Sequence, residues 1–314
     1  MSASLILKPY QPELRADWDE VIASSINGTF IHQRDFIAYH GDRFEECSLI
    51  FFFNGKPVAV FPAEKSENRV FSYRGLTYAG WIISEALEEG QLGNVIKDTL
   101  EYFCANGYHS LEVRMVPDFF YLGSASTLKT TVEKFKPELV RKSIFHATAL
   151  PFQISDRGRK WGRKKSESLK LSVKESVDFE GFWQDVLEPH LLEKFQNKPV
   201  HSLEKILYLQ SCFPDNIKLL AVYQEAEMLA GTVLFLQNQV VHCQYIASTS
   251  IGRDCRALDL LFGMILDKFN GDKSYLSLGT SLDARTGKPI PGLIKWKESL
   301  GGKGFVGRIL EFRF

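Results

Sequence analysis

The feature that most constrains the fold of this chain is an internal repeat. When Leu14–Ile22 (LRADWDEVI) is placed beside Phe179–Leu187 (FEGFWQDVL), Trp18 meets Trp183 at an offset of 165 residues. The same order of apolar runs and polar turns follows in both halves, with residues 48–73 facing 219–244 and residues 95–114 facing 261–280. A repeated order of elements indicates duplicated structural units. We therefore predict two tandem domains, residues 1–155 and 156–314.

Each copy reads as an α+β domain. The runs Leu49–Phe53 and Leu219–Tyr223 have the β-branched and aromatic bias of strands, and Asn54–Gly55 is a strong hairpin signal. The later helix and strand of each copy are predicted at Leu92–Ala105 and 111–115, and at Ala257–Phe269 and 275–279. Strand, helices, antiparallel meander, helix and strand predict a mixed, mostly antiparallel sheet flanked by helices in each domain.

Composition excludes several classes of protein. The 38 basic and 38 acidic residues balance, which argues against a surface that coats nucleic acid or an anionic membrane as a whole. The five cysteines are widely spaced and the seven histidines form no recognisable triad, so we predict neither a disulfide framework nor a metal site. No stretch approaches the roughly 18 apolar residues of a membrane span. We expect a soluble, cytoplasmic protein without integral membrane association.

Three stretches carry a family resemblance. Residues 29–40 (TFIHQRDFIAYH) contain Phe30, Gln33 and Phe36, and residues 159–176 (RKWGRKKSESLKLSVKES) form a basic segment between the two copies. Near the end, residues 292–303 read GLIKWKESLGGK. Together these stretches resemble the signatures of Fem-type peptidoglycan-bridge transferases and related tandem GNAT acyltransferases. The last stretch matches the family pattern G-L-x-x-F-K-x-x-F-G at Gly292, Leu293, Lys297 and Gly301, whereas Trp296 and Leu300 replace its two aromatic residues.

The resemblance implies transfer of an acyl or aminoacyl group to an amine. Fem proteins take an amino acid from aminoacyl-tRNA and add it to a cell-wall precursor, while other GNAT relatives take an acyl group from coenzyme A. The implied acceptor is an amine of a cell-envelope or sugar precursor, either a small molecule or linked to a nucleotide. A GNAT-like protein that only binds a ligand, without catalysis, is the alternative.

The donor loop leaves acyl-CoA and aminoacyl-tRNA both open. In GNAT proteins the pyrophosphate of coenzyme A rests on backbone amides of a glycine-rich loop at a helix N-terminus. Residues 248–261 (STSIGRDCRALDLL) keep one glycine, Gly252, and offer Arg253 and Arg256, but Asp254 would repel a phosphate or simply cap the helix. The corresponding stretch of the first copy, residues 84–98, is acidic. We therefore expect the donor in the second domain and the acceptor on the side of the first.

A local cluster of positive charge supports a tRNA partner. Residues 157–165 (RGRKWGRKK) hold six basic residues in nine, with Trp161 among them. Phosphates of a tRNA acceptor stem or of a nucleotide-linked acceptor suit such a cluster. A solvated linker between domains explains it equally.

Three residues are candidates for the chemistry itself. Aminolysis of an ester or thioester needs removal of a proton and stabilisation of an oxyanion. Lys297 borders the apolar stripe of its predicted helix and matches the motif lysine, so it can stabilise the oxyanion; a surface lysine is the alternative. Asp283 follows the last core strand and is either a base or a turn former. Tyr245 ends the second meander and is either an acid or substrate contact, or a half-buried aromatic.

The acceptor-side candidates come from the end of the first meander. The stretch YRGLTYAGW contains Tyr73, Arg74 and Tyr78, which we expect to face a cleft between the domains. Aromatic rings and one guanidinium suit a sugar or nucleotide, although a hairpin core also accounts for them. Gln33 joins this set through the resemblance of its motif. The predicted binding residues are Gln33, Tyr73, Arg74, Tyr78, Arg253 and Arg256.

Overall fold

The computed structural model describes residues 5–85, 87–283 and 286–314, which group into two compact units. Unit 1 comprises the chain up to residue 143 together with residues 306–314, and unit 2 comprises residues 144–305. Within the described residues, no helix is long and apolar enough to cross a membrane.

Unit 1 combines two sheets with helices on their faces. Its elements are β1 Leu5–Pro9, η1 Pro12–Leu14, α1 Arg15–Ala23, η2 Phe30–His32, α2 Arg34–Ala38, η3 Gly41–Arg43, β2 Glu45–Glu46, β3 Leu49–Phe53, β4 Lys56–Phe61, β5 Glu64–Ser66, β6 Arg69–Phe71, β7 Ile82–Ile83, α3 Glu89–Ala105, β8 Ser110–Arg114, η4 Asp118–Phe120, α4 Ser126–Lys134 and the first part of β9 Glu138–Ala149. The last strand, β15 Lys303–Arg313, returns to this unit and pairs antiparallel with β8.

The sheets of unit 1 are mixed and mostly antiparallel. One has the order β1-β3-β4-β7, and the other continues from β15 and β8 through β6 and β5 to β2, with β6 and β8 pairing in parallel. Asn54 and Gly55, both with positive φ, form the turn between β3 and β4. The hairpin predicted from this dipeptide is therefore confirmed.

Unit 2 repeats this order around a longer sheet. Its elements are α5 Arg157–Ser168, β10 Ser172–Ser176, α6 Phe179–Gly181, the π-helical turn η5 Phe182–Leu187, α7 Glu188–Phe195, α8 Leu203–Cys212, β11 Ile217–Gln224, β12 Glu227–Leu236, β13 Val240–Ser248, α9 Ser250–Asp254, α10 Ala257–Phe269, β14 Tyr275–Thr280 and α11 Pro291–Glu298. The strands run β10-β11-β12-β13-β14, and the end of β9 pairs antiparallel with β14. β13 and β14 pair in parallel.

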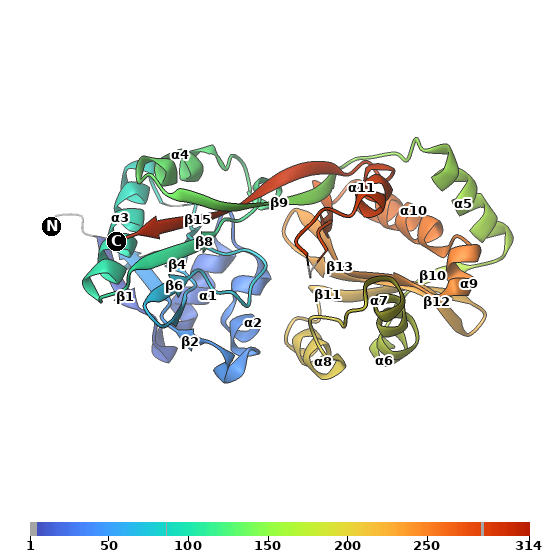
Figure 1. Ribbon diagram of the computed structural model, residues 1–314, viewed down its shortest axis with the longest axis horizontal. Helices are drawn as coiled ribbons and strands as arrows, with labels where there is room; N and C mark the ends of the chain where they lie inside the picture. The colour runs from blue at the N-terminus through green and yellow to red at the C-terminus, as the bar shows by residue number, and fades with distance from the viewer. Residues whose placement is uncertain (1–4, 86, 284–285) are drawn as a thin grey trace. The chain divides into compact units, whose positions relative to one another are not determined.

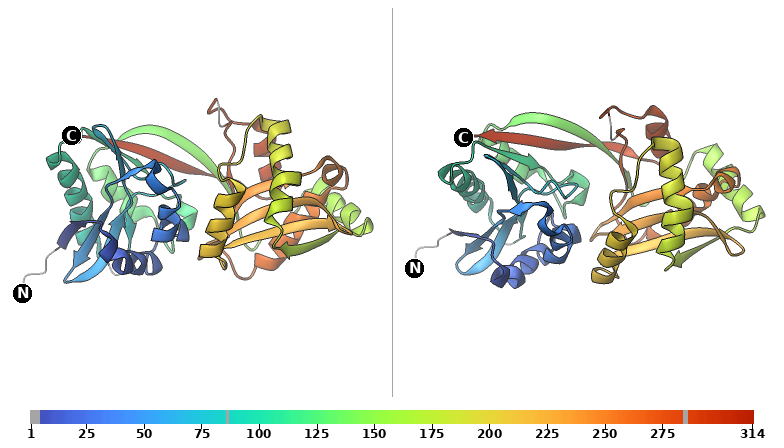
Figure 2. Two further views of the ribbon diagram at one scale, coloured as in Figure 1. Left: turned by 90° about the horizontal axis from the view of Figure 1, so that it is seen from below. Right: turned by 60° about the horizontal axis from the view of Figure 1, so that its bottom comes forward.

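Helices cover both faces of the sheet in unit 2. Figure 1 shows α10 and α5 on one face and α6, α7 and α8 on the other, and in Figure 2 the yellow-green α7 stands in front of the orange strands. Apolar residues of α10, among them Leu261 and Ile265, are buried against Val241 and Cys243 of β13. The α+β architecture predicted from the sequence is confirmed, and α10 has the predicted bounds.

A buried tryptophan, histidine and tyrosine recur in both units. In unit 1 the indole N–H of Trp18 donates to the carbonyl of His32 at 2.8 Å, and His32 Nε2 lies 3.1 Å from the carbonyl of Tyr78. In unit 2 the indole N–H of Trp183 donates to the carbonyl of His201 at 3.3 Å. His201 Nδ1 then lies 2.6 Å from the hydroxyl of Tyr245. We call these the two Trp–His–Tyr clusters.

The histidines of the two clusters should make the fold sensitive to acid. Burial lowers the pKa of His32 and that of His201 to about 4, from 6.5. Between these values the unfolded chain binds more protons than the folded one, so the free energy of unfolding falls as pH is lowered. We expect the free energy of unfolding, measured with urea, to fall by about 2 kcal/mol per histidine between pH 7 and pH 5.

A single substitution tests this assignment. The free energy of unfolding of His201→Gln should change less between pH 7 and pH 5, because one titrating group has been removed. An equal change in the variant and the natural protein would show that His201 does not cause the acid sensitivity.

Candidate functional site

The candidate site of unit 2 lies where two parallel strands separate. β13 and β14 pair only from Val240 to His242 and from Tyr275 to Ser277, although β13 continues to Ser248. β14 instead pairs with β9 through an irregular register, and Gly279 has φ +68°. In the described part of the chain, the later half of β13 therefore has an edge that β14 does not cover.

Lys297 places a buried charge at the end of β14. Its helix, α11, directs the ammonium to the carbonyls of Gly279 and Thr280, which accept hydrogen bonds at 3.0 and 2.5 Å. The residue is 2% exposed, and no carboxylate of the described residues lies within ion-pair distance of it. Burial lowers its pKa to about 8. At neutral pH the site therefore holds a cation whose charge no carboxylate neutralises.

Two imidazoles accompany this ammonium. His242 of β13 lies 3.0 Å from the hydroxyl of Ser277 through Nδ1, and His146 of β9 lies 3.3 Å from that of Ser281. Burial lowers the pKa of His242 to about 4 and also lowers that of His146, and in both cases the Lys297 ammonium adds to the effect. Both rings are neutral at pH 7, so they can accept a proton beside a fixed positive charge.

A pocket of about 290 Å³ lies at the N-terminus of α10. Three of its lining residues are the arginines Arg159, Arg253 and Arg256. Arg253 donates to the carbonyl of Ser248 at 3.2 Å and pairs with Glu193. The pocket thus combines guanidinium groups with a helix N-terminus, which favours an anion.

Two of the three arginines of this pocket are held by one buried carboxylate. Asp259 is 2% exposed and pairs with Arg159 at 2.5 Å and with Arg256 at 2.6 Å. Arg159 also donates to the hydroxyl of Ser299 at 2.9 Å, which connects α5, α10 and α11. The guanidinium groups are therefore fixed before any ligand arrives.

Gly252 serves packing within the loop. A Cβ at this position would lie 2.2 Å from the carbonyl oxygen of Leu229, so only glycine lets α9 approach β12 so closely. Asp254 ends α9, and α10 begins after Arg256, which has a left-handed backbone, so Asp254 does not cap α10. The expectation that Asp254 caps this helix is wrong, because Thr249 caps α9 and a short helix precedes α10.

The basic segment after β9 forms the helix α5. One of its faces packs on α10, where Arg159 pairs with Asp259 and Arg163 pairs with Asp267 at 2.7 Å. The other face carries Trp161, which is 59% exposed. The exposed cations of that face are Arg157, Lys160 and Lys164. The segment is therefore a helix with a paired inner face and a charged outer face.

The remaining predicted residues have structural contacts of their own. Tyr245 and Tyr78 belong to the two Trp–His–Tyr clusters, where both are buried. Asp283 accepts hydrogen bonds from the amide and the hydroxyl of Thr286 at 2.7 and 2.9 Å, which closes a turn. These contacts give each side chain a structural partner. Of the predicted residues in unit 2, Lys297 lies at the end of β14, and Arg253 and Arg256 line the pocket at the N-terminus of α10.

The acceptor-side candidates lie in unit 1. Tyr73 is buried with φ +60°, and its ring lies 5.4 Å from that of Phe44. Arg74 binds the buried carboxylate of Glu64 through its amide and its guanidinium. Gln33 precedes α2, is partly exposed, and makes no side-chain cap hydrogen bond there. Of these residues, Arg74 and Gln33 are accessible to a ligand.

The sequence analysis missed His242, His146 and the Arg159–Asp259 pair. His242 and His146 lie on different strands, and neither has a motif around it. The only signal for the pair was the spacing of Arg159, Arg163 and Ser166, which falls on one face of a helix. Among the described residues, no three His, Cys, Asp or Glu side chains are arranged to hold a metal ion.

The buried ammonium of Lys297 should appear in the pH dependence of stability. Its pKa is about 8 in the folded chain and 10.5 for an unperturbed lysine, so between these values the unfolded chain binds more protons. The free energy of unfolding of the natural protein should therefore rise with pH over this interval, relative to Lys297→Met, by about 3 kcal/mol in total. Urea unfolding from pH 7 to pH 10.5 measures this difference; parallel curves for the two proteins would contradict it.

Comparison with known proteins identifies the fold. No family model and no curated protein matches the chain. Among solved structures, FemX has a TM-score of 0.70 at 10% identity, over 98% of this chain and 97% of that one. The TM-score to L-PGS from Bacillus licheniformis is 0.61 at 13% identity, over 98% of this chain and 93% of that one. The TM-score to a tandem GNAT protein from the clavulanic acid biosynthesis pathway is 0.51 at 10% identity, over 99% of this chain and 98% of that one. Over nearly its whole length, the chain thus has the tandem GNAT fold in the form that FemX shows.

Proposed function

We propose that this protein is a transferase that moves an acyl or aminoacyl group onto an amine. The observation that carries the proposal is the buried ammonium of Lys297, which lies where β13 and β14 separate and beside two neutral imidazoles. An unneutralised cation in a site of low dielectric constant stabilises a developing oxyanion far better than one in water. The fold shared with FemX is consistent with this chemistry.

The reaction needs no covalent intermediate on the protein. The amine nitrogen attacks the carbonyl carbon of an ester or thioester, a carbon–nitrogen bond forms, and the carbonyl oxygen takes the negative charge next to Lys297. The bond from carbon to the leaving oxygen or sulfur then breaks, and the oxygen regains its double bond. The proton lost by the amine goes to a neutral imidazole, for which His242 is the first candidate, since Ser277 orients its ring.

The pocket at the N-terminus of α10 supports acyl-CoA as the donor. A diphosphate there would meet Arg253 and Arg256, whose positions are fixed by ion pairs. Arg159 adds a third guanidinium to the same wall. Gly252 is required for packing on β12. Its presence in the loop is therefore evidence neither for nor against phosphate binding.

Aminoacyl-tRNA is the second candidate donor. The outer face of α5 carries Arg157, Lys160 and Lys164 around the exposed Trp161. Phosphates and an unpaired base suit this combination of cations and an aromatic ring. The tRNA-dependent chemistry of the Fem proteins, which the sequence resembles, agrees with this alternative.

The acceptor follows from the Fem resemblance. We take it to be an amine of a cell-envelope or sugar precursor, with Arg74 and Gln33 of unit 1 as candidate contacts because both are accessible. The non-catalytic alternative, a protein that only holds such a ligand, predicts binding without transfer.

Removing the Lys297 charge should abolish transfer and leave donor binding intact. With acetyl-CoA and a panel of amino sugars and nucleotide-linked amino sugars, acylated product is measured by mass spectrometry. Lys297→Met should lower kcat about 10²-fold or more, the usual effect of losing one oxyanion-stabilising group. Lys295→Met is the matched control, since Lys295 lies on the same helix but is exposed. Equal rates in both variants would remove the assigned role of Lys297.

A calorimetric titration with acetyl-CoA and longer acyl-CoAs tests the donor. We expect micromolar binding that Arg256→Glu weakens at least tenfold, because the charge at the pocket is reversed and the Asp259 pair is broken. Arg141→Glu, an equal charge change at an exposed position of unit 1, should have no effect. No binding of any acyl-CoA, together with tRNA binding that Arg157→Glu and Lys164→Glu abolish, would favour the tRNA donor instead.

A further inference from the structure

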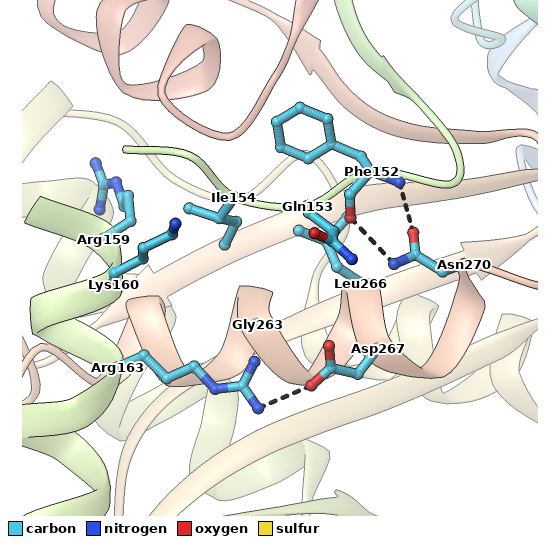
Figure 3. Close-up of a pocket in the computed structure, with 10 residues that line it drawn as sticks. All are labelled: Phe152, Gln153, Ile154, Arg159, Lys160, Arg163, Gly263, Leu266, Asp267 and Asn270. Carbon is cyan, nitrogen blue, oxygen red and sulfur yellow. Dashed lines mark hydrogen bonds and ion pairs between the residues drawn. The ribbon is translucent and has the colours of Figure 1, made fainter. Parts of the chain in front are cut away.

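A second pocket of unit 2, of about 280 Å³, lies along the outer side of α10. Helix α10 contributes the stripe Gly263, Leu266, Asp267 and Asn270, spaced as one helix face. The opposite wall is the segment of residues 152–154 that follows β9, and the start of α5 closes one end (Figure 3). Arg159 lines both this pocket and the one at the N-terminus of α10, but the two are otherwise formed by different residues.

Two features keep this pocket open and its walls fixed. Gly263 has no side chain, and a Cβ there would lie 2.9 Å from Cδ and Nη1 of Arg163, so the glycine makes room for the arginine that crosses α10. The side chain of Asn270 accepts from the amide of Phe152 at 2.9 Å and donates to its carbonyl at 3.0 Å. Figure 3 shows both bonds, which tie the wall segment to the end of α10.

The floor of the pocket is apolar. Leu266 is buried in the core of unit 2, and Ile154 packs against the same core while remaining partly exposed. The ring of Phe152 points away from α10 in Figure 3 and lies against Gly301, so Phe152 lines the pocket near its backbone. A hydrocarbon laid over Ile154 and Leu266 would be removed from water along one side. This favours a ligand with an apolar body, at about 0.8 kcal/mol for each methylene that becomes fully buried.

Among the lining cations that the structure describes, Lys160 is the one without a carboxylate partner. Arg163 pairs with Asp267 at 2.7 Å and Glu167 at 3.0 Å, and Arg159 shares Asp259 with Arg256. Lys160 is exposed at the same end of the pocket and has no ion-pair or hydrogen-bond partner in the part of the chain that the structure describes. Because Asp267 is already paired, it does not oppose an anion near Lys160. One free positive charge fits a monoanion better than a phosphate dianion.

We propose that this pocket binds a small amphiphilic carboxylate, with its apolar body on Ile154 and Leu266 and its carboxylate against the ammonium of Lys160. This proposal does not rest on the transfer proposed above, although Arg159 also lines the pocket at the N-terminus of α10 and Lys160 also belongs to the outer face of α5. The ligand would span from the cationic end to Phe152 in Figure 3.

Octanoate is the probe that tests this proposal, in calorimetric titrations of the full chain. Saturable binding is expected, and butanoate should bind at least tenfold more weakly, because it lacks four methylenes that the floor would bury. In ¹⁵N-labelled protein the amide of Gly263 should shift with the same dissociation constant, which places the ligand in this pocket. Absence of saturable octanoate binding would overturn the proposal.

Substitution of Lys160 tests the charged end. Lys160→Gln should weaken octanoate binding about fivefold, as expected for an exposed ion pair, and leave the binding of 1-octanol unchanged. Lys164→Gln, one turn further along the exposed face of α5 and outside the pocket, is the matched control. Equal weakening by both substitutions would show general attraction to a basic helix and would also overturn the assignment.

Discussion

The hydrogen bond from a buried tryptophan to a histidine carbonyl organises each unit. Trp18 and Trp183 have no exposed surface, and each indole N–H reaches a carbonyl from a later turn of the chain. An unpaired indole N–H in such a core would cost free energy, so the position of that turn is fixed with the helix. The histidine that supplies the carbonyl then fixes a tyrosine near the end of the meander. One sequence signal, the repeated tryptophan, thus specifies a helix, a turn and a strand together.

In unit 2 this constraint leaves one edge of β13 available for chemistry. Tyr245 anchors β13 to His201 on one face, while Val241 and Cys243 are buried against α10 on the other. With β13 held in place, the departure of β14 at Gly279 opens the edge between the two strands. The Lys297 ammonium then binds the carbonyls that this departure exposes.

Sequence reasoning succeeded where the signal is local and failed where contacts join distant segments. The dipeptide Asn54–Gly55 requires two positive φ angles, so the hairpin could be predicted from it alone. Lys297 was predicted from its position beside an apolar stripe and from the family pattern; the residue is buried, and its role stays a prediction. The charge of Lys297 acts on His242 and His146 because β13, β9 and α11 converge, and no periodicity encodes that convergence. Burial of Tyr78 and Tyr245 agrees with the alternatives of a hairpin core and a half-buried aromatic, but nothing in their own segments indicates the histidines that contact them.

Four cations of unit 2 differ in how their charges affect stability. Arg159, Arg163 and Arg256 pair with carboxylates of α10, so their charges stabilise the fold. Among the described residues no carboxylate pairs with the buried Lys297, and its lowered pKa corresponds to about 3 kcal/mol of free energy that folding must offset. A methionine would fill similar volume without that cost. The oxyanion stabilisation that we propose requires such an unpaired charge at the end of two separating strands.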